Sequence, residues 1–114
     1  MNSSKVGKIL VVDDEVELKN VLVEALSSQG YETTGFTDGQ EALATLRDQT
    51  FDILLTDLMM PGMDGITLVR ESLQIDPNLI CIMMTGQGTI QTAVDAMKIG
   101  TFVLLVKIQG VLNS

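Results

Sequence analysis

Polar residues follow short apolar runs at four places in the chain, and their types suit phosphate chemistry. They are Asp13 with Asp14, Asp57, Thr85 and Lys107. If these runs are parallel strands, the residues converge at one edge of a sheet, where two carboxylates 4 Å apart repel by about 4 kcal/mol at an effective dielectric constant near 20. A divalent cation would relieve that repulsion. With no histidine and one cysteine in the sequence, the cation must be a hard ion held by oxygen, so Mg²⁺ is the expected cofactor.

A carboxylate nucleophile, Mg²⁺, a lysine and a hydroxyl together indicate phosphoryl transfer to an aspartate. Asp57 is the expected nucleophile, because the glycine-rich stretch Met60–Gly65 follows it and would leave its carboxylate open to a donor. Lys107 would pair with a carboxylate or a phosphoryl oxygen. Thr85 would donate a hydrogen bond, and Gly86 after it would let the backbone approach a ligand.

Short β-rich apolar runs alternate with longer stretches of helical spacing along the chain. The predicted strands are Lys8–Val12, Tyr31–Phe36, Phe51–Thr56, Leu79–Met84 and Phe102–Val106, and the helical stripes run from Val16 to Leu26, Ala42 to Leu46, Ile66 to Leu73 and Ile90 to Met97. Asp38 and Asp64 are the expected N-caps of the second and third helices. The alternation predicts an α/β fold, a doubly wound sheet of five parallel strands with helices on both faces.

The length of 114 residues indicates one domain, expected over residues 8–107. Residues 1–7 are interpreted as a flexible N-terminal lead. Only seven residues follow Lys107, whereas a typical helix has about 11–12. We therefore expect the fifth helix to be missing or truncated, and residues 108–114 to form an atypical short tail.

Composition restricts the partners and the compartment. The net charge of −8 leaves no basic stripe for nucleic-acid phosphates or anionic lipid, so neither nucleic acid nor membrane is an expected partner. No apolar run approaches the roughly 20 residues that span a bilayer, and no leader opens the chain, so a cytoplasmic protein is expected. Without histidine, zinc sites of the usual kind and Ser/His or Cys/His catalytic pairs are excluded. Cys81 lies mid-strand and is expected to be a buried, inert thiol.

Four motifs together resemble the receiver domain of two-component response regulators, from about Lys8 to Lys107. They are Ile9–Glu15, Asp57–Gly65, Met84–Gly86 and Val106–Lys107. The resemblance implies a flavodoxin-like strand order of 2-1-3-4-5. The stretch Thr85–Val94 also resembles receivers attached to AAA+ transcription activators or hybrid kinases.

Family roles can be assigned to matching residues. The resemblance implies that Asp57 accepts phosphate from a histidine kinase or a phosphotransfer protein, that Asp14 binds Mg²⁺ directly and that Asp13 acts through the metal's coordination sphere. The backbone carbonyl of Met59 would be a further ligand, beside Asp57 itself. On activation Thr85 would hydrogen-bond the phosphoryl group.

The implied activity is a switch. Lys107 would pair with the phosphoryl group, and phosphorylation would change a partner or an attached output domain. The protein would not be an enzyme beyond its own phosphorylation and dephosphorylation at Asp57.

The chain departs from the family after Gly100. Leu104 stands where the family commonly has an aromatic switch residue, and Ile108 stands where a proline usually follows the lysine. Without a fifth helix, the sheet would expose apolar side chains near its first and fifth strands. The chain could therefore form a dimer, either through the exposed sheet face or through the region of the fourth helix and fifth strand.

Other interpretations stay open at this point. A non-switching interaction module fits Leu104 and the missing helix. An aspartyl-phosphate phosphohydrolase is a further alternative, although Met59 stands where such enzymes place a second acid. Taken singly, Asp13 and Asp14 could cap a helix, Thr85 could be a turn residue and Lys107 a surface lysine.

Overall fold

The computed structural model describes residues 7–84 and, for the backbone only, residues 102–104. Thr85 and Lys107 therefore lie outside the described residues. The fourth helical stripe, Ile108 and the predicted tail also lie outside them.

Within residues 7–84 and 102–104, five strands and three helices follow one another in the order predicted. They are β1 (Lys8–Val12), α1 (Val16–Ser28), β2 (Glu32–Phe36), α2 (Gly39–Asp48), β3 (Ile53–Asp57), α3 (Gly65–Ile75), β4 (Ile80–Met84) and β5 (Phe102–Leu104). Strands β2, β3 and β4 begin one or two residues later than predicted. Phe51 and Leu79 are only 2% and 5% exposed, so the apolar run continues into the connections because these side chains also enter the core.

Helix boundaries follow from local hydrogen bonds. The Asp38 carboxylate accepts from the amide of Gln40, and that of Asp64 accepts from the amide of Thr67 at 2.8 Å, which confirms both predicted N-caps. Gly30, whose φ is 98°, lies just beyond α1 in a conformation that glycine adopts readily.

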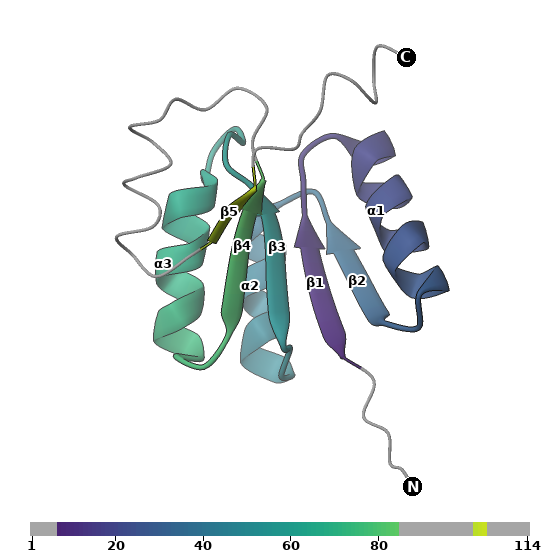
Figure 1. The fold of residues 1–114 in the computed structure, drawn as a ribbon. Coiled ribbons are helices and arrows are strands. Elements are labelled where there is room, and N and C mark those ends of the chain that lie inside the picture. Colours follow the sequence, from purple (N-terminus) through teal and green to yellow (C-terminus); the bar gives the residue numbers. More distant parts are fainter. Residues whose placement is uncertain (1–6, 85–101, 105–114) are drawn as a thin grey trace, which may run out of the picture.

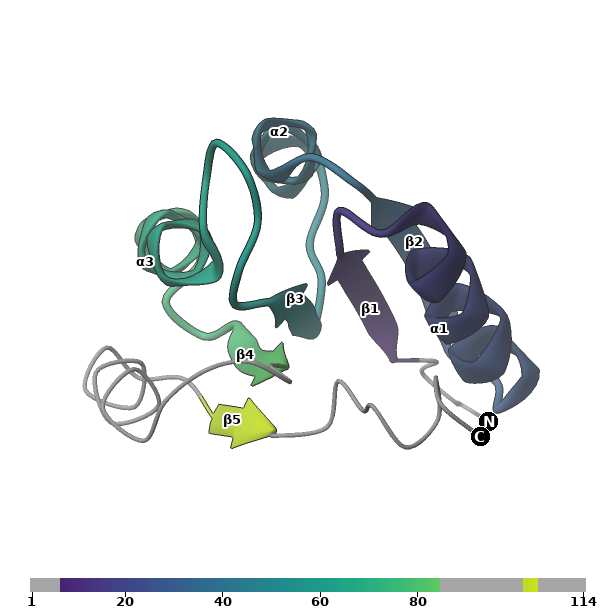
Figure 2. The same ribbon diagram turned by 90° about the horizontal axis from the view of Figure 1, so that it is seen from above.

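All strand pairs are parallel, and the strand order is β2-β1-β3-β4-β5 (Figure 1). Helices α2 and α3 lie on one face of the sheet and α1 on the other, over β1 and β2 (Figure 2). This arrangement confirms the predicted doubly wound sheet, in which all the described strands end at the same edge.

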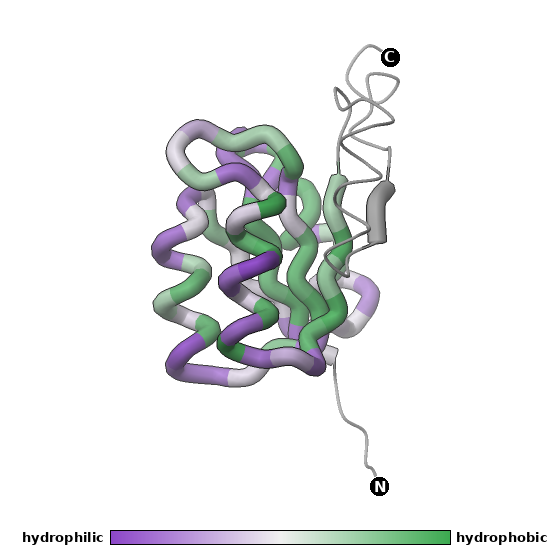
Figure 3. The backbone as a smooth tube through the Cα atoms, turned by 90° about the vertical axis from the view of Figure 1, so that its left-hand side faces the viewer, coloured by the Kyte–Doolittle hydropathy of each residue, from purple (hydrophilic) through white to green (hydrophobic). Residues whose placement is uncertain are grey.

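The main core lies between the sheet and helices α2 and α3. Leu10, Leu43, Leu54, Leu68 and Met83 are fully buried there, and hydrophobic residues follow the strands and the inward sides of these helices (Figure 3). Burial of one such side chain contributes about 1.5–3 kcal/mol. This packing holds the strands whose ends carry the polar residues.

The opposite face is covered differently. None of the α1 side chains is buried, and Val16 and Val21 are more than half exposed. Ile9 and Val11, which point to this face of β1, are buried, so the prediction of apolar exposure at the first strand is wrong. The exposed apolar residue lies instead on β4, where Ile80 is 49% exposed. The side chains of β5 lie outside the described part of the chain.

Among the described residues, no helix combines the length and the apolar character needed to cross a bilayer.

Cys81 is 1% exposed in the middle of β4, as predicted. Burial raises the pKa of its thiol from 9.0 to about 11, and the nearby Asp76 carboxylate adds to the rise. The thiol is therefore neutral at physiological pH.

This pKa predicts a pH dependence of stability. Above about pH 9 the unfolded thiol loses its proton while the folded thiol keeps it up to about pH 11, so the free energy of unfolding should fall across this window by roughly 2–3 kcal/mol. The control, Cys81→Ala, lacks this titration and should show a correspondingly shallower decline. Urea unfolding at a series of pH values measures both proteins, and parallel curves would contradict the prediction.

Candidate functional site

Three carboxylates meet at the carboxyl edge of the sheet. Asp13 and Asp14 follow β1, and Asp57 is the last residue of the neighbouring strand β3, where Val12 pairs with Thr56. One carboxylate oxygen from each aspartate lies within 4.8 Å of the other two. The sequence prediction that these residues converge is therefore confirmed.

Burial intensifies the repulsion in this cluster. Asp13 is 0% exposed and Asp57 is 2% exposed, while Asp14 is more accessible. Like charges in such surroundings interact more strongly than in bulk water. Three hard oxygen donors at this separation suit a divalent cation that prefers oxygen, such as Mg²⁺.

Short turns hold two of these side chains. The Asp13 carboxylate accepts a hydrogen bond from the amide of Glu15 at 2.9 Å, and the Asp57 carboxylate accepts one from the amide of Met59 at 3.3 Å. Glu15 occupies the N-cap position of α1, and it makes no side-chain capping bond. The alternative in which Asp13 and Asp14 form the cap of this helix is therefore wrong.

The two peptide groups that flank Leu58 are both held by hydrogen bonds. The Leu58 amide donates to the carbonyl of Met84 at 2.9 Å, and the Leu58 carbonyl accepts from the amide of Gly65, also at 2.9 Å. Gly65 approaches so closely that a Cβ there would lie 2.9 Å from Leu58 Cα and closer still to the Asp57 carbonyl oxygen. The sequence indicates a glycine-rich loop, but it does not predict how closely Gly65 packs against the backbone of Asp57 and Leu58.

The loop after Asp57 also contacts the start of α2. Met63 packs against Gly39, where an added Cβ would lie 2.9 Å from the Met63 sulfur. Met59 in the same loop is 58% exposed. The role of its backbone carbonyl as a ligand stays a prediction.

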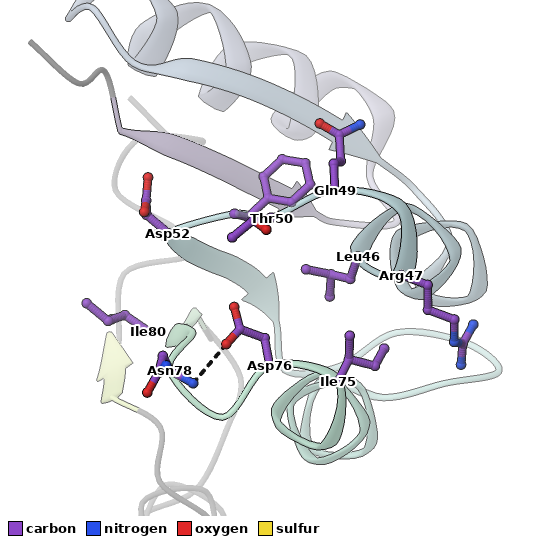
Figure 4. Close-up of a pocket in the computed structure, with 10 residues that line it drawn as sticks. Leu46, Arg47, Gln49, Thr50, Asp52, Ile75, Asp76, Asn78 and Ile80 are labelled. Carbon is purple, nitrogen blue, oxygen red and sulfur yellow. Dashed lines mark hydrogen bonds between the residues drawn. The ribbon is translucent and has the colours of Figure 1, made fainter.

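A hollow of about 560 Å³ lies at the opposite edge of the sheet, where β3 and β4 begin (Figure 4). Asp52 and Asp76 are among the residues that line it, and backbone amides donate to both carboxylates. Asp52 accepts from the Lys8 amide at 2.8 Å, and Asp76 accepts from the Asn78 amide at 3.0 Å. The aspartate cluster does not line this hollow, so the hollow is no substrate pocket for the cluster.

The sequence matches the family model of the response regulator receiver domain over residues 9–111. It is 42% identical over 101 residues to the DNA-binding transcriptional regulator NtrC of Salmonella typhimurium, an alignment covering 89% of this chain and 22% of that protein. The chain thus spans about a fifth of the length of this regulator.

Solved structures agree with the sequence match. The chemotaxis protein CheY4 of Vibrio cholerae superposes with a TM-score of 0.85 at 28% identity, covering 90% of this chain and 88% of that one. The beryllofluoride-activated NtrC4 receiver domain, solved as a dimer, superposes with a TM-score of 0.79 at 28% identity, covering 93% and 90%.

The close approach of Gly65 generates a prediction with a matched control, since Gly65 and Gly39 each begin a helix. Gly65→Ala should lower the free energy of unfolding by about 1–3 kcal/mol, because its new Cβ meets backbone that cannot rotate away. Gly39→Ala should cost clearly less, because the flexible Met63 side chain can move. Urea unfolding compares the two variants, and equal losses would refute the packing argument.

Proposed function

The chain belongs to the response regulator receiver family, and we propose that it accepts a phosphoryl group on Asp57 and thereby switches a partner or output domain. The observation that carries this proposal is the buried Asp57 carboxylate at a sheet edge, within 4.8 Å of the carboxylates of Asp13 and Asp14. Such a site concentrates the oxygen ligands and the nucleophile that phosphoryl transfer requires.

In the proposed step, an Asp57 carboxylate oxygen forms a bond to the phosphorus of a phosphohistidine on a histidine kinase or phosphotransfer protein. The phosphorus–nitrogen bond breaks, and the imidazole leaves with the electron pair. Hydrolysis of the resulting acylphosphate returns Asp57 and inorganic phosphate. No other substrate is turned over.

The cation of the proposal is Mg²⁺, with Asp13, Asp14, Asp57 and the backbone carbonyl of Met59 as the protein groups around it. When bound, it would neutralise the carboxylates and the oxygens of the transferred group. The Asp13–Glu15 and Asp57–Met59 hydrogen bonds support this assignment, because they hold two of the carboxylates before any ligand arrives.

Thr85 and Lys107 complete the proposal as the hydroxyl and the cation that engage the phosphoryl group. Thr85 directly follows β4, and Met84 pairs with Leu104 of β5. The proposed site therefore takes residues from the ends of β1, β3 and β4 and, in Lys107, one residue that comes after β5 in the sequence.

The partners of this proposal follow from the relatives. NtrC of Salmonella typhimurium is a DNA-binding transcriptional regulator of which this chain spans 22%, which favours an activator-type output domain. The NtrC4 receiver was solved as a beryllofluoride-activated dimer, and Ile80 gives this chain an apolar residue on its sheet face. Both observations favour a dimer as a further partner.

We assign the receiver to residues 8–107 and the protein to the cytoplasm.

A second candidate, a receiver that is phosphorylated without switching, is favoured by one observation. Leu104 lies beside Met84, next to the strand end that leads to Thr85, where the family commonly has an aromatic residue. An aliphatic side chain there lacks the ring that couples this strand to the hydroxyl.

Phosphorylation is tested with a small acyl phosphate and Mg²⁺. The wild-type protein should gain the mass of one labile phosphoryl group, and Asp57→Asn should gain none because an amide is no nucleophile for phosphorus. Asp52→Asn, at the other end of the same strand, is the matched control and should be modified like the wild type. Chelation of the cation should stop the reaction. A folded wild-type protein without this mass increase would refute the proposal.

Switching is tested separately by amide hydrogen exchange with beryllofluoride as the phosphoryl mimic and fluoride alone as the control. The proposed switch should change protection in peptides that contain β4 and β5, and Leu104→Phe should enlarge that change. Unchanged exchange in both proteins would instead support the non-switching receiver.

A further inference from the structure

A buried hydroxyl directly precedes the phosphoacceptor. Thr56 is 0% exposed, and its side chain points to the same face of β3 as Leu54, which lies in the main core. Its Oγ1 donates a hydrogen bond to the carbonyl oxygen of Asp57 at 3.0 Å. No feature of the sequence pattern distinguished this residue from its apolar neighbours.

Packing alone does not account for a hydroxyl at this position. Valine has nearly the same shape, fits a strand equally well and avoids the cost of burying a polar group. The neighbouring core residues on this face of the sheet include Val12 and Met83, which are both fully buried. The hydrogen bond to Asp57 is therefore the property that threonine adds and valine would lack.

The accepting carbonyl belongs to the peptide group that connects Asp57 to its loop. Gly65 packs against the same oxygen, and the Leu58 amide of this peptide group donates to Met84. One residue further on, the Met59 amide donates to the Asp57 carboxylate. Rotation of this peptide group would consequently shift both the carboxylate and the backbone of Met59.

We propose that Thr56 is a positioning residue for the phosphorylation of Asp57, acting through its hydrogen bond to the Asp57 carbonyl. This inference rests on the proposed function of Asp57. Thr56 and Asp57 point to opposite faces of the strand, so the hydroxyl acts through the backbone and does not touch the reacting atoms.

The size of the effect follows from what one hydrogen bond is worth. Loss of a bond that holds reacting groups in place should slow phosphorylation by about fivefold to tenfold. Valine fills the same space but leaves the buried Asp57 carbonyl without this donor, so some loss of stability should accompany the slower rate. Thr56→Ser separates the two effects, because it loses a buried methyl group and should keep the rate.

The main experiment compares the wild-type chain with Thr56→Val, Thr56→Ser and Thr45→Val. Initial rates of phosphorylation by a small acyl phosphate are measured at saturating Mg²⁺, together with urea unfolding. Thr56→Val should be about fivefold to tenfold slower and somewhat less stable. Thr56→Ser should keep the wild-type rate although it loses a methyl group. Thr45→Val removes a hydroxyl that donates to the carbonyl of Glu41 in α2, and it should leave the rate unchanged.

A wild-type rate in Thr56→Val overturns the proposal, as does a slow rate in Thr56→Ser. If the valine variant does not fold, Thr56→Ser and Thr56→Ala share the same missing methyl group and differ in the hydroxyl alone. Equal rates in that pair also overturn it.

A readout without phosphate separates this inference from the proposed function. Amide exchange at Met59 should accelerate in Thr56→Val and stay at the wild-type value in Thr56→Ser, because the loop is less well held in the valine variant. If the wild type takes no phosphate, the proposed function fails, and the exchange data still decide whether Thr56 positions the loop. Unchanged Met59 exchange in Thr56→Val refutes the positioning role.

Discussion

The mutual repulsion of three carboxylates is the constraint on which the rest of the structure depends. Asp13, Asp14 and Asp57 bring oxygens within 4.8 Å of one another, and two of the three are buried. Nothing in these side chains favours that arrangement, so the backbone must impose it. The parallel pairing of β1 with β3, anchored by the core residues Leu10 and Leu54, supplies the necessary rigidity.

Much of the fold and part of the site could be predicted from the sequence, because both depend on the spacing of the apolar residues and on the positions of the polar residues that follow them. The alternation of apolar runs gave the order of elements, and the polar residues at the ends of the first and third runs gave the aspartate cluster. Asp38 and Asp64 were recognisable as caps because capping depends on local sequence. The start of β3 could not be predicted in this way, because Phe51 precedes the strand ladder but is as buried as a strand residue.

The features that escaped prediction arise from contacts across the fold. The approach of Gly65 to the Asp57–Leu58 peptide group depends on how α3 follows the loop, and a glycine in a loop looks the same with or without it. In the sequence, Thr56 looks like an ordinary strand threonine, so its hydrogen bond to the Asp57 carbonyl could not be predicted. Val21 is exposed although it belongs to the helical stripe of α1, and a helical stripe alone does not reveal which of its members a neighbouring element covers.

The hydrogen bond from the Leu58 amide to the Met84 carbonyl has a consequence for the cooperativity of unfolding. It continues the β3–β4 ladder one residue beyond Asp57, so the first residue of the site loop shares a bond with a buried central strand. Surface loops commonly open in local fluctuations far smaller than global unfolding. Here the beginning of the loop belongs to the same cooperative unit as the sheet, whereas the exposed Met59 beyond it bonds to the Asp57 carboxylate and not to the ladder. The boundary between the rigid and the adaptable parts of the molecule therefore falls within the site, between Leu58 and Met59.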